Sequence, residues 1–376
     1  MALTVSGARP CVRCHGGARR DLWPHAFTLA GRAALLRHWY LLVRLHIMFL
    51  TLILFFLSAL IIYFACEYFV NGIEWVGHRM HLGVTAVGTV LAAFGTALPE
   101  SAVTFVAVVF GATPEQKDIG VGAAMGGPLV LSTLAYAVVG VALWRIRRAS
   151  CINADQPRLA RDQAWFMGVF VFKVGLGVLA FAWKPWLALL FLGVYGLYVK
   201  RELANDEASM GEDDLEPLKL RPRDGNPSMA WACTQTLLAL IVIAGASHVF
   251  VNQIEWLGVA FGASPHVAAL LLAPVATELP EIMNALIWVR QGKERLALAN
   301  ISGAMMIQAT IPSALGIAMT PWLLDGPLLV AGLLTLVAIS VLWLQFSRAR
   351  MRISVLSAVG GLYGVFALYL FWHFWM

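Results

Sequence analysis

Long apolar stretches dominate this 376-residue chain and limit what it can fold into. A helix needs about 20 apolar residues to cross a bilayer, and in lipid its backbone groups must be satisfied within the protein. Ten stretches have this spanning character, although the fifth is short. With 60% hydrophobic and 13% charged residues, the composition excludes a soluble globular class. We predict an all-α membrane protein with about ten transmembrane helices. The stretches cover residues 49–70, 82–110, 119–143, 164–183, 185–199, 230–254, 264–289, 296–318, 327–346 and 353–375.

Basic residues fall mainly in alternate loops between these stretches. If the first stretch starts outside the cell, 17 Lys and Arg residues lie in inner loops, while only Lys117 and Lys184 lie in outer loops. Such an excess is typical of cytoplasmic loops. The net charge of +6 therefore indicates topology rather than a nucleic-acid partner. We expect a multi-pass protein of the cell membrane, which in bacteria is the inner membrane. Its expected partners are membrane lipid and inorganic cations, and the sequence predicts no oligomeric state.

The two halves of the chain repeat each other. Residues 69–77 match residues 250–258 at an offset of 181, and residues 118–127 match residues 295–304 at an offset of 177. Five spans per half is an odd number, so the two halves would sit upside down relative to each other. Inverted repeats of this kind are typical of secondary transporters. We therefore divide the chain into a head (1–47), a first repeat (48–200), a cytoplasmic linker (201–228) and a second repeat (229–376).

The head and the linker are hydrophilic. The head contains seven arginines and no stretch long enough to span. It is either a genuine cytoplasmic or targeting segment, or an extension in front of a natural start at Met48. Its Cys11, Cys14 and His15 match a haem attachment pattern, but no export signal precedes them, so we expect no cofactor. The linker has the composition of a solvated segment, with cation binding by its acidic residues as the alternative.

A Leu-Pro-Glu sequence occurs in both halves, within residues 94–100 and 275–281. Each copy has a threonine four residues before its glutamate, so hydroxyl and carboxylate share one helix face. Proline lacks an N–H group, which leaves the carbonyl four residues earlier without its helical partner. Each stretch thus offers the oxygen ligands that hard cations prefer. The predicted cation ligands are Gly95, Thr96 and Glu100 in the first copy, and Ala276, Thr277 and Glu281 in the second.

A third carboxylate, Glu278, precedes Glu281 by three residues. It lies on nearly the same helix face, either as a further ligand or at the mouth of the site. Three carboxylates at mid-membrane oppose insertion by roughly 8–10 kcal/mol, a cost that a chain with no use for them would not keep. Ionising neighbouring carboxylates in a low dielectric is also costly, which favours proton uptake by at least one of them.

This doubled motif, followed in each half by a helix of small residues, resembles the cation/calcium antiporter superfamily, and within it the sodium/calcium exchangers. The resemblance extends over residues 60–143 and 240–318. It implies exchange of Ca²⁺ against Na⁺ or H⁺ by alternating access. It also implies that Glu100 and Glu281 are the central metal ligands and that the two motif threonines, Thr96 and Thr277, supply sodium-binding hydroxyls.

The third span of each half departs from the pattern of that family. Where the family has Gly-Ser-Asn, this chain has Gly127 and Ala304 in place of the serines. The polar position that ends the pattern is Leu131 in the first half and Gln308 in the second, where Gln308 is either a ligand or an interhelical contact. Glu278 stands where the family motif has a serine. Several side-chain oxygens that would bind sodium are therefore missing from this chain. We predict a secondary cation antiporter coupled to protons more than to sodium.

Further charged residues lie inside the apolar stretches. Lys173 could pair with Glu67 or stand in for a bound cation, and Glu67 or His248, at its repeat position, could relay protons. A passive cation channel and a non-transporting membrane scaffold are the alternatives to an antiporter. No zinc-protease or serine-nucleophile motif lies in a span, so we do not expect an enzyme.

Overall fold

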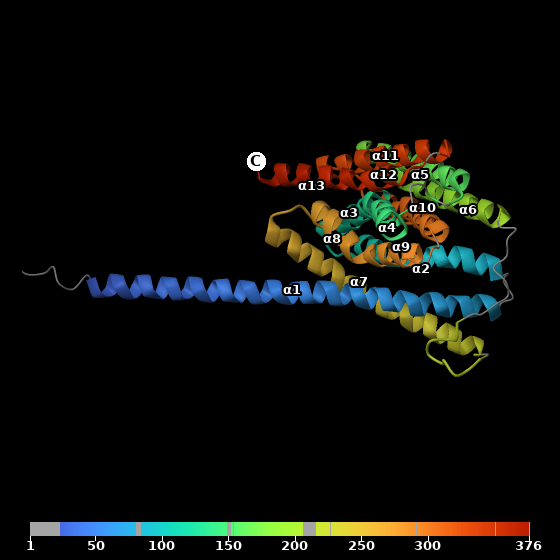
Figure 1. Cartoon of the computed structure of the whole chain (residues 1–376). Coiled ribbons are helices and arrows are strands. Elements are labelled where there is room, and N and C mark those ends of the chain that lie inside the picture. The colour runs from blue at the N-terminus through green and yellow to red at the C-terminus, as the bar shows by residue number, and fades with distance from the viewer. Residues whose placement is uncertain are drawn as a thin grey trace, which may run out of the picture. The chain divides into compact units, whose positions relative to one another are not determined.

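The computed structural model describes the chain except residues 1–22, 80–83, 149–151, 153, 206–215, 226, 291, 293, 350 and 376. The Cys-x-x-Cys-His string and the first 22 residues of the predicted head thus lie outside the described residues. The chain has two compact units, Met1–Leu50 and Thr51–Met376. The described part of the first unit, from Trp23, is helical, and the second unit holds the helices that follow (Figure 1).

Each of the ten predicted stretches contains helix among its described residues, and the fourth leaves helix after Val178. The first half comprises α1 (Trp23–Arg79), α2 (Val84–Phe110), α3 (Pro114–Val130), η1 (Leu131–Ala135), α4 (Tyr136–Ala142), η2 (Leu143–Arg147), α5 (Gln156–Val178), η3 (Lys184–Leu187) and α6 (Ala188–Asn205). The second half comprises α7 (Met229–Phe261), α8 (Pro265–Thr277), α9 (Leu279–Arg290), α10 (Glu294–Met319), α11 (Gly326–Ser347), α12 (Ile353–Ala358) and α13 (Gly360–Trp375).

Several described helices are long and apolar enough to cross a membrane. Six segments meet this condition, and two shorter apolar helices, Ala97–Phe110 and Pro265–Pro274, accompany them. The count of ten spans therefore stays a prediction. The six segments are His38–Phe69, Pro114–Ile146, Met229–Phe261, Ala297–Met319, Gly326–Ser347 and Ile353–His373.

The two Leu-Pro-Glu stretches differ in helix continuity. Helix α2 continues through Pro99 as one helix, whereas Glu278 separates α8 from α9. The backbone N–H of Glu278 donates to the carbonyl of Pro274 at 2.9 Å, and its carbonyl accepts from Ile282 at 3.0 Å. The predicted disruption is therefore a break in the second copy, just before Pro280.

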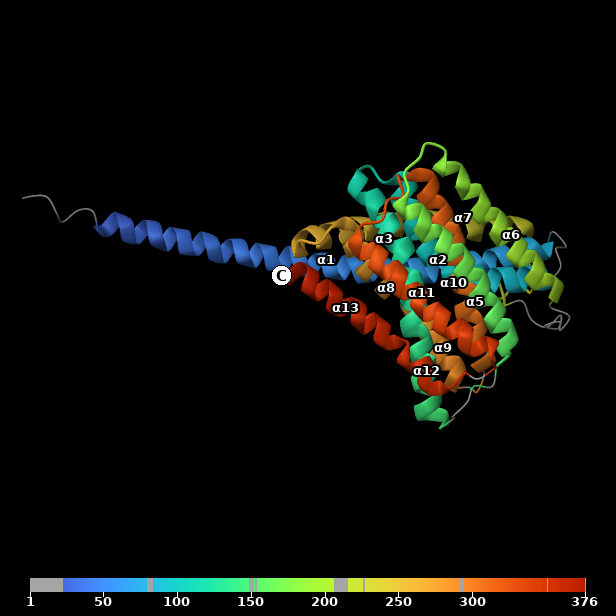
Figure 2. The same cartoon turned by 90° about the horizontal axis from the view of Figure 1, so that it is seen from above.

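The two halves pack crosswise. Helix α3 lies along α8, and α10 of the second half packs against α2 of the first (Figure 1). A Cβ atom at Gly126 would lie 2.6 Å from the carbonyl oxygen of Leu270, and one at Gly122 would overlap the carbonyl of His266. Glycines four residues apart let membrane helices approach this closely. On the outer side, α5 packs against α11 (Figure 2).

The end of the linker is folded against the helices rather than solvated as predicted. Trp75 Nε1 donates to the carbonyl of Glu216 at 2.9 Å, and the Asn71 side chain donates to the same carbonyl at 3.2 Å. Leu218 is completely buried. These contacts bury apolar surface and satisfy backbone groups that composition alone would leave to water. The acidic residues 206–215, where cation binding was the alternative, lie outside the described residues.

Candidate cation-binding site

The hydroxyl of Thr277 connects carboxylates from the two halves of the chain. Its oxygen lies 2.7 Å from Oε2 of Glu100 in α2 and 3.2 Å from Oε1 of Glu278, and it also contacts the carbonyl of Ala273 at 3.1 Å. The side chains of Glu100, Thr277 and Glu278 are all buried. The break after α8 leaves Thr277 and Glu278 adjacent at a helix end, from which both reach the same region.

The third spans complete this arrangement. Gln308 of α10 donates from Nε2 to Oε1 of Glu278 at 2.8 Å. A Cβ atom at Gly127 of α3 would lie 2.7 Å from Gln308 Oε1 and 3.2 Å from Glu278 Oε1. Gly127 therefore borders the site, and the absence of a side chain there leaves room for the Gln308 amide. Glycine in place of the family serine at position 127 is thus linked to the long side chain of Gln308 opposite it.

Several oxygen atoms at this site lack a hydrogen-bond donor. Oε1 of Glu100, Oε2 of Glu278 and Oε1 of Gln308 are buried and accept no hydrogen bond from the described residues. A buried acceptor without a partner costs about 1–3 kcal/mol. Carboxylate and amide oxygens are the ligands that hard cations prefer. These three oxygens are therefore candidate cation ligands.

The structure brings Glu100 together with Glu278, whereas the motif alone pointed to Glu100 and Glu281. Glu281 is buried in the first turn of α9, three residues beyond Glu278. Among the described residues, no three His, Cys, Asp or Glu side chains are grouped to hold a metal ion, so the three glutamates do not converge on one point. Gly95, Thr96 and Ala276 lie in described helices, but the side chains of Thr96 and Ala276 and the surroundings of Gly95 lie outside the described part of the site.

Lys173 of α5 is completely buried beside the site. Its Nζ donates to the carbonyl of Ala124 in α3 at 2.7 Å and lies 5.0 Å and 5.7 Å from the ring centroids of Phe170 and Trp322. Burying an ammonium group is costly unless other groups compensate its charge. The carboxylate of Glu100 is the charged group that interacts with it electrostatically. Lys173 thus places a buried amine next to the first-half carboxylate.

The predicted pairing of Lys173 with Glu67 is wrong. Glu67 of α1 forms an ion pair with Lys219 of the linker at 3.1 Å. Glu67 pairs with Lys219 instead of Lys173 because the end of the linker folds back and brings Lys219 to α1. His248 of α7 is exposed. The structure therefore brings neither proposed relay residue into contact with the Thr277 hydroxyl.

A polar cluster that the sequence did not predict also lies in the core. The hydroxyls of Tyr136 in α4 and Ser302 in α10 are 2.8 Å apart, and Gln163 Nε2 of α5 donates to both, at 2.6 Å and 3.1 Å. All three side chains are buried. They lie in three separate stretches, so no local motif could reveal the cluster.

Comparison with known proteins decides the family. The family model described as sodium/calcium exchanger protein matches residues 50–201 and 231–375. The chain belongs to the sodium/calcium exchanger family. This exchanger-family chain is a multi-pass membrane protein, and its matched segments contain both Leu-Pro-Glu stretches.

This exchanger-family chain is similar in sequence to two bacterial proteins. It is 29% identical over 241 residues to inner membrane protein YrbG of Escherichia coli, covering 64% of this chain and 70% of YrbG. It is 23% identical over 287 residues to the putative antiporter CaxA of Alkalimonas amylolytica, covering 72% and 81% of the two chains.

Solved structures share the fold. The crystal structure of the H⁺/Ca²⁺ exchanger CAX superposes with a TM-score of 0.61 at 18% identity, covering 94% of this chain and 95% of CAX. The sodium-calcium exchanger NCX_Mj superposes with a TM-score of 0.53 at 18% identity, covering 85% and 98%. At these identities the likeness establishes the fold of the exchanger-family chain.

Proposed function

We propose that this chain is a secondary active antiporter that exchanges Ca²⁺, or another divalent cation, against protons by alternating access. One observation carries the proposal: a single buried hydroxyl, that of Thr277, joins carboxylates from both halves of the chain. Around it lie buried oxygens without donors. Such a site between two repeats can open to either side of the membrane as one repeat moves against the other.

The crosswise packing supports this mechanism. The first-half carboxylate, Glu100, lies on α2, which packs against α10 of the second half. The second-half carboxylate, Glu278, lies at the end of α8, which packs against α3 of the first half. Each of these helices thus packs against a helix of the other half, an arrangement that supports an inverted repeat. Any movement between the halves changes the cation site directly.

Proton coupling follows from the number of hydrogens at Thr277. The hydroxyl has one hydrogen, yet two carboxylate oxygens and the carbonyl of Ala273 lie within 3.2 Å of its oxygen. A proton on Glu100 can be donated to the hydroxyl oxygen, while the hydroxyl hydrogen is donated to Glu278 or to Ala273. An arriving divalent cation would displace this proton, and its departure would restore it. The third-span positions Gly127 and Ala304 supply no side-chain oxygen for sodium.

The test is Ca²⁺ counterflow in proteoliposomes, with glutamates replaced one at a time by glutamine. Glu100→Gln, Glu278→Gln and Glu281→Gln each remove a negative charge with little change in shape, and we expect each to abolish exchange. Glu115→Gln is the matched control, because Glu115 is exposed in the first turn of α3. Wild-type rates in the Glu100 and Glu278 variants would contradict the proposal. Loss of exchange in the control would show instead that the assay reports general damage.

A further inference from the structure

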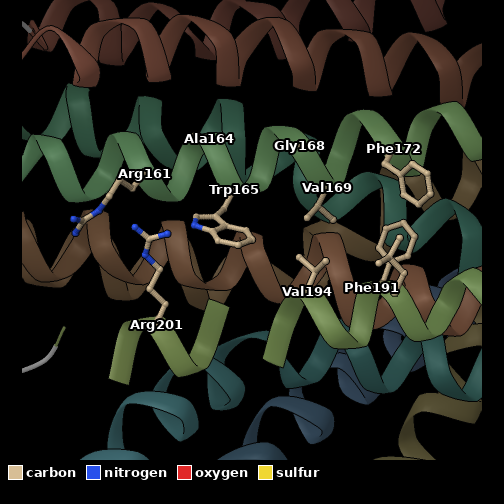
Figure 3. A pocket seen from close by; sticks show the side chains of 10 residues that line it. Arg161, Ala164, Trp165, Gly168, Val169, Phe172, Phe191, Val194 and Arg201 are labelled. Atoms are coloured by element: carbon tan, nitrogen blue, oxygen red, sulfur yellow. The ribbon is translucent and has the colours of Figure 1, made fainter. Parts of the chain in front are cut away.

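Helices α5 and α6 form a groove of about 480 Å³ on the outside of the helical core. Both helices pack against α10 beneath them. The groove is lined by Trp165, Gly168 and Phe172 from α5 and by Phe191 from α6, whose ring stacks on Phe172 with centroids 5.6 Å apart (Figure 3). A volume of this size lies within the range of about 300–1,000 Å³ that is usual for small-molecule sites.

The groove is open where an apolar chain could lie. A Cβ atom at Gly168 would have no heavy atom within 4 Å. Phe172 and Leu190 at the groove are exposed, and apolar side chains are exposed along the same two helices. In a membrane protein such a surface faces lipid acyl chains rather than water. The protein itself therefore leaves this apolar groove unfilled.

The end of the groove away from Phe172 and Phe191 is basic. Figure 3 shows the guanidinium groups of Arg161 from α5 and Arg201 from α6 at the same end, across the groove from each other. Both side chains are exposed, and among the described residues neither takes part in an ion pair. Arginine presents planar paired donors that match the oxygens of a phosphate. Both residues belong to the cytoplasmic side in the predicted topology.

The length of the groove matches one leaflet. Eleven residues separate Arg161 from Phe172 on α5. At about 1.5 Å per residue, this separation corresponds to about 17 Å along the helix. One leaflet contributes about half of the ~30 Å hydrocarbon core. A phosphate at the arginines would therefore place an acyl chain along Gly168, with its end near the aromatic pair at the membrane midplane.

We propose that this groove is a binding site for an anionic phospholipid of the cytoplasmic leaflet. The phosphate binds between Arg161 and Arg201, and one acyl chain lies in the groove. The apolar lining favours a lipid over a soluble phosphate, which could use only the two arginines. The inference rests on the proposed topology of α5 and α6, but not on ion exchange. Because α10 also carries Gln308, the lipid would support one wall of the cation site.

The experiment is native mass spectrometry of the full chain in detergent, titrated with phosphatidylglycerol or with phosphatidylcholine of the same acyl chains. We expect retention of phosphatidylglycerol to be favoured. Each basic residue near the surface contributes about fivefold to the attraction of an anionic lipid, so Arg161→Gln with Arg201→Gln should reduce the preference about 25-fold. Gly168→Leu should weaken the binding of both lipids by filling the groove. Glycerol phosphate, which has no acyl chain, should not displace the lipid.

Two matched controls separate a specific site from general effects. Arg348→Gln with Arg352→Gln removes two exposed arginines elsewhere on the predicted cytoplasmic side, and the lipid preference should persist. Gly196→Leu adds the same side chain on α6 where a Cβ atom also has open space, but outside the groove lining, so lipid binding should persist there too. An unchanged preference in the Arg161 and Arg201 variant, or equal losses in the controls, would overturn the inference. Glu100→Gln should retain lipid fully, so failure of ion exchange would leave this result unaffected.

Discussion

A Cβ atom at Gly127 would lie 2.7 Å from Oε1 of Gln308, so these two positions of opposite halves cannot both carry a large side chain as they stand. Gly127→Ser should therefore displace Gln308 from Glu278 and destabilise the fold by about 1–3 kcal/mol, the usual cost of overpacking. Shortening the partner in the double variant Gly127→Ser with Gln308→Asn should recover much of that loss. Thermal unfolding of the purified variants measures both effects. Additive losses in the double variant would show that the two positions are independent.

The second prediction concerns the shared hydroxyl. Thr277→Val keeps the shape of the side chain but removes the hydroxyl that joins Glu100 Oε2 to Glu278 Oε1. A hydrogen bond to a charged group contributes about 1.5–3 kcal/mol, so Ca²⁺ exchange should fall about ten- to a hundredfold. Thr277→Ser keeps the hydroxyl and should remain active. Initial rates of Ca²⁺ uptake into proteoliposomes distinguish the two variants, and equal rates would rule out a role for the hydroxyl.

The third prediction concerns Lys173, which is buried beside the site. Lys173→Met should increase the affinity for cations several-fold, because it removes a buried ammonium group that interacts with Glu100. Lys184→Met is the matched control: Lys184 is also buried, and its Nζ donates to the carbonyls of Leu179, Pro321 and Trp322. Both variants should lose stability, but only the first should change Ca²⁺ binding. Equilibrium binding of radioactive Ca²⁺ is the measurement. Equal changes of Ca²⁺ affinity in the two variants would show that Lys173 has no special role in cation binding.

The fourth prediction concerns topology. The distribution of basic residues predicts that a reporter fused after Met210 is cytoplasmic and that one fused after Met376 is external. The measurement is the activity of a reporter that works on only one side of the membrane. The reverse pair of locations would overturn the assumed orientation, and two reporters on the same side would overturn the count of ten spans.

Much of the fold could be predicted from the sequence, because hydropathy alone determines which stretches are buried in lipid. Each of the ten apolar stretches contains helix, although α1 begins at Trp23, well before the first stretch. The motif also identified side chains that the structure places together, since Thr277 and Glu278 are neighbours in sequence and Gln308 is the remaining polar residue of its pattern. Local spacing was sufficient in these cases.

Other features depend on how distant segments pack, which the sequence did not reveal. The break at Glu278 places that carboxylate beside the hydroxyl that binds Glu100. Lys173 donates to the backbone carbonyl of Ala124 and interacts with Glu100 rather than Glu67, and neither partner is near it in sequence. Folding of the linker end against α1 gave Glu67 a different partner, Lys219. Each outcome depends on tertiary contacts that no local pattern encodes.

The measurement that tests proton-coupled antiport most directly is Ca²⁺ uptake into proteoliposomes under two gradients applied separately. In one, a proton gradient is imposed with no sodium present; in the other, a sodium gradient is imposed at uniform pH. We predict uptake that is driven by the proton gradient and lost in Glu100→Gln, because the proton shared through Thr277 is exchanged for the divalent cation. Uptake driven by sodium alone, and insensitive to pH between about 6 and 8, would contradict it.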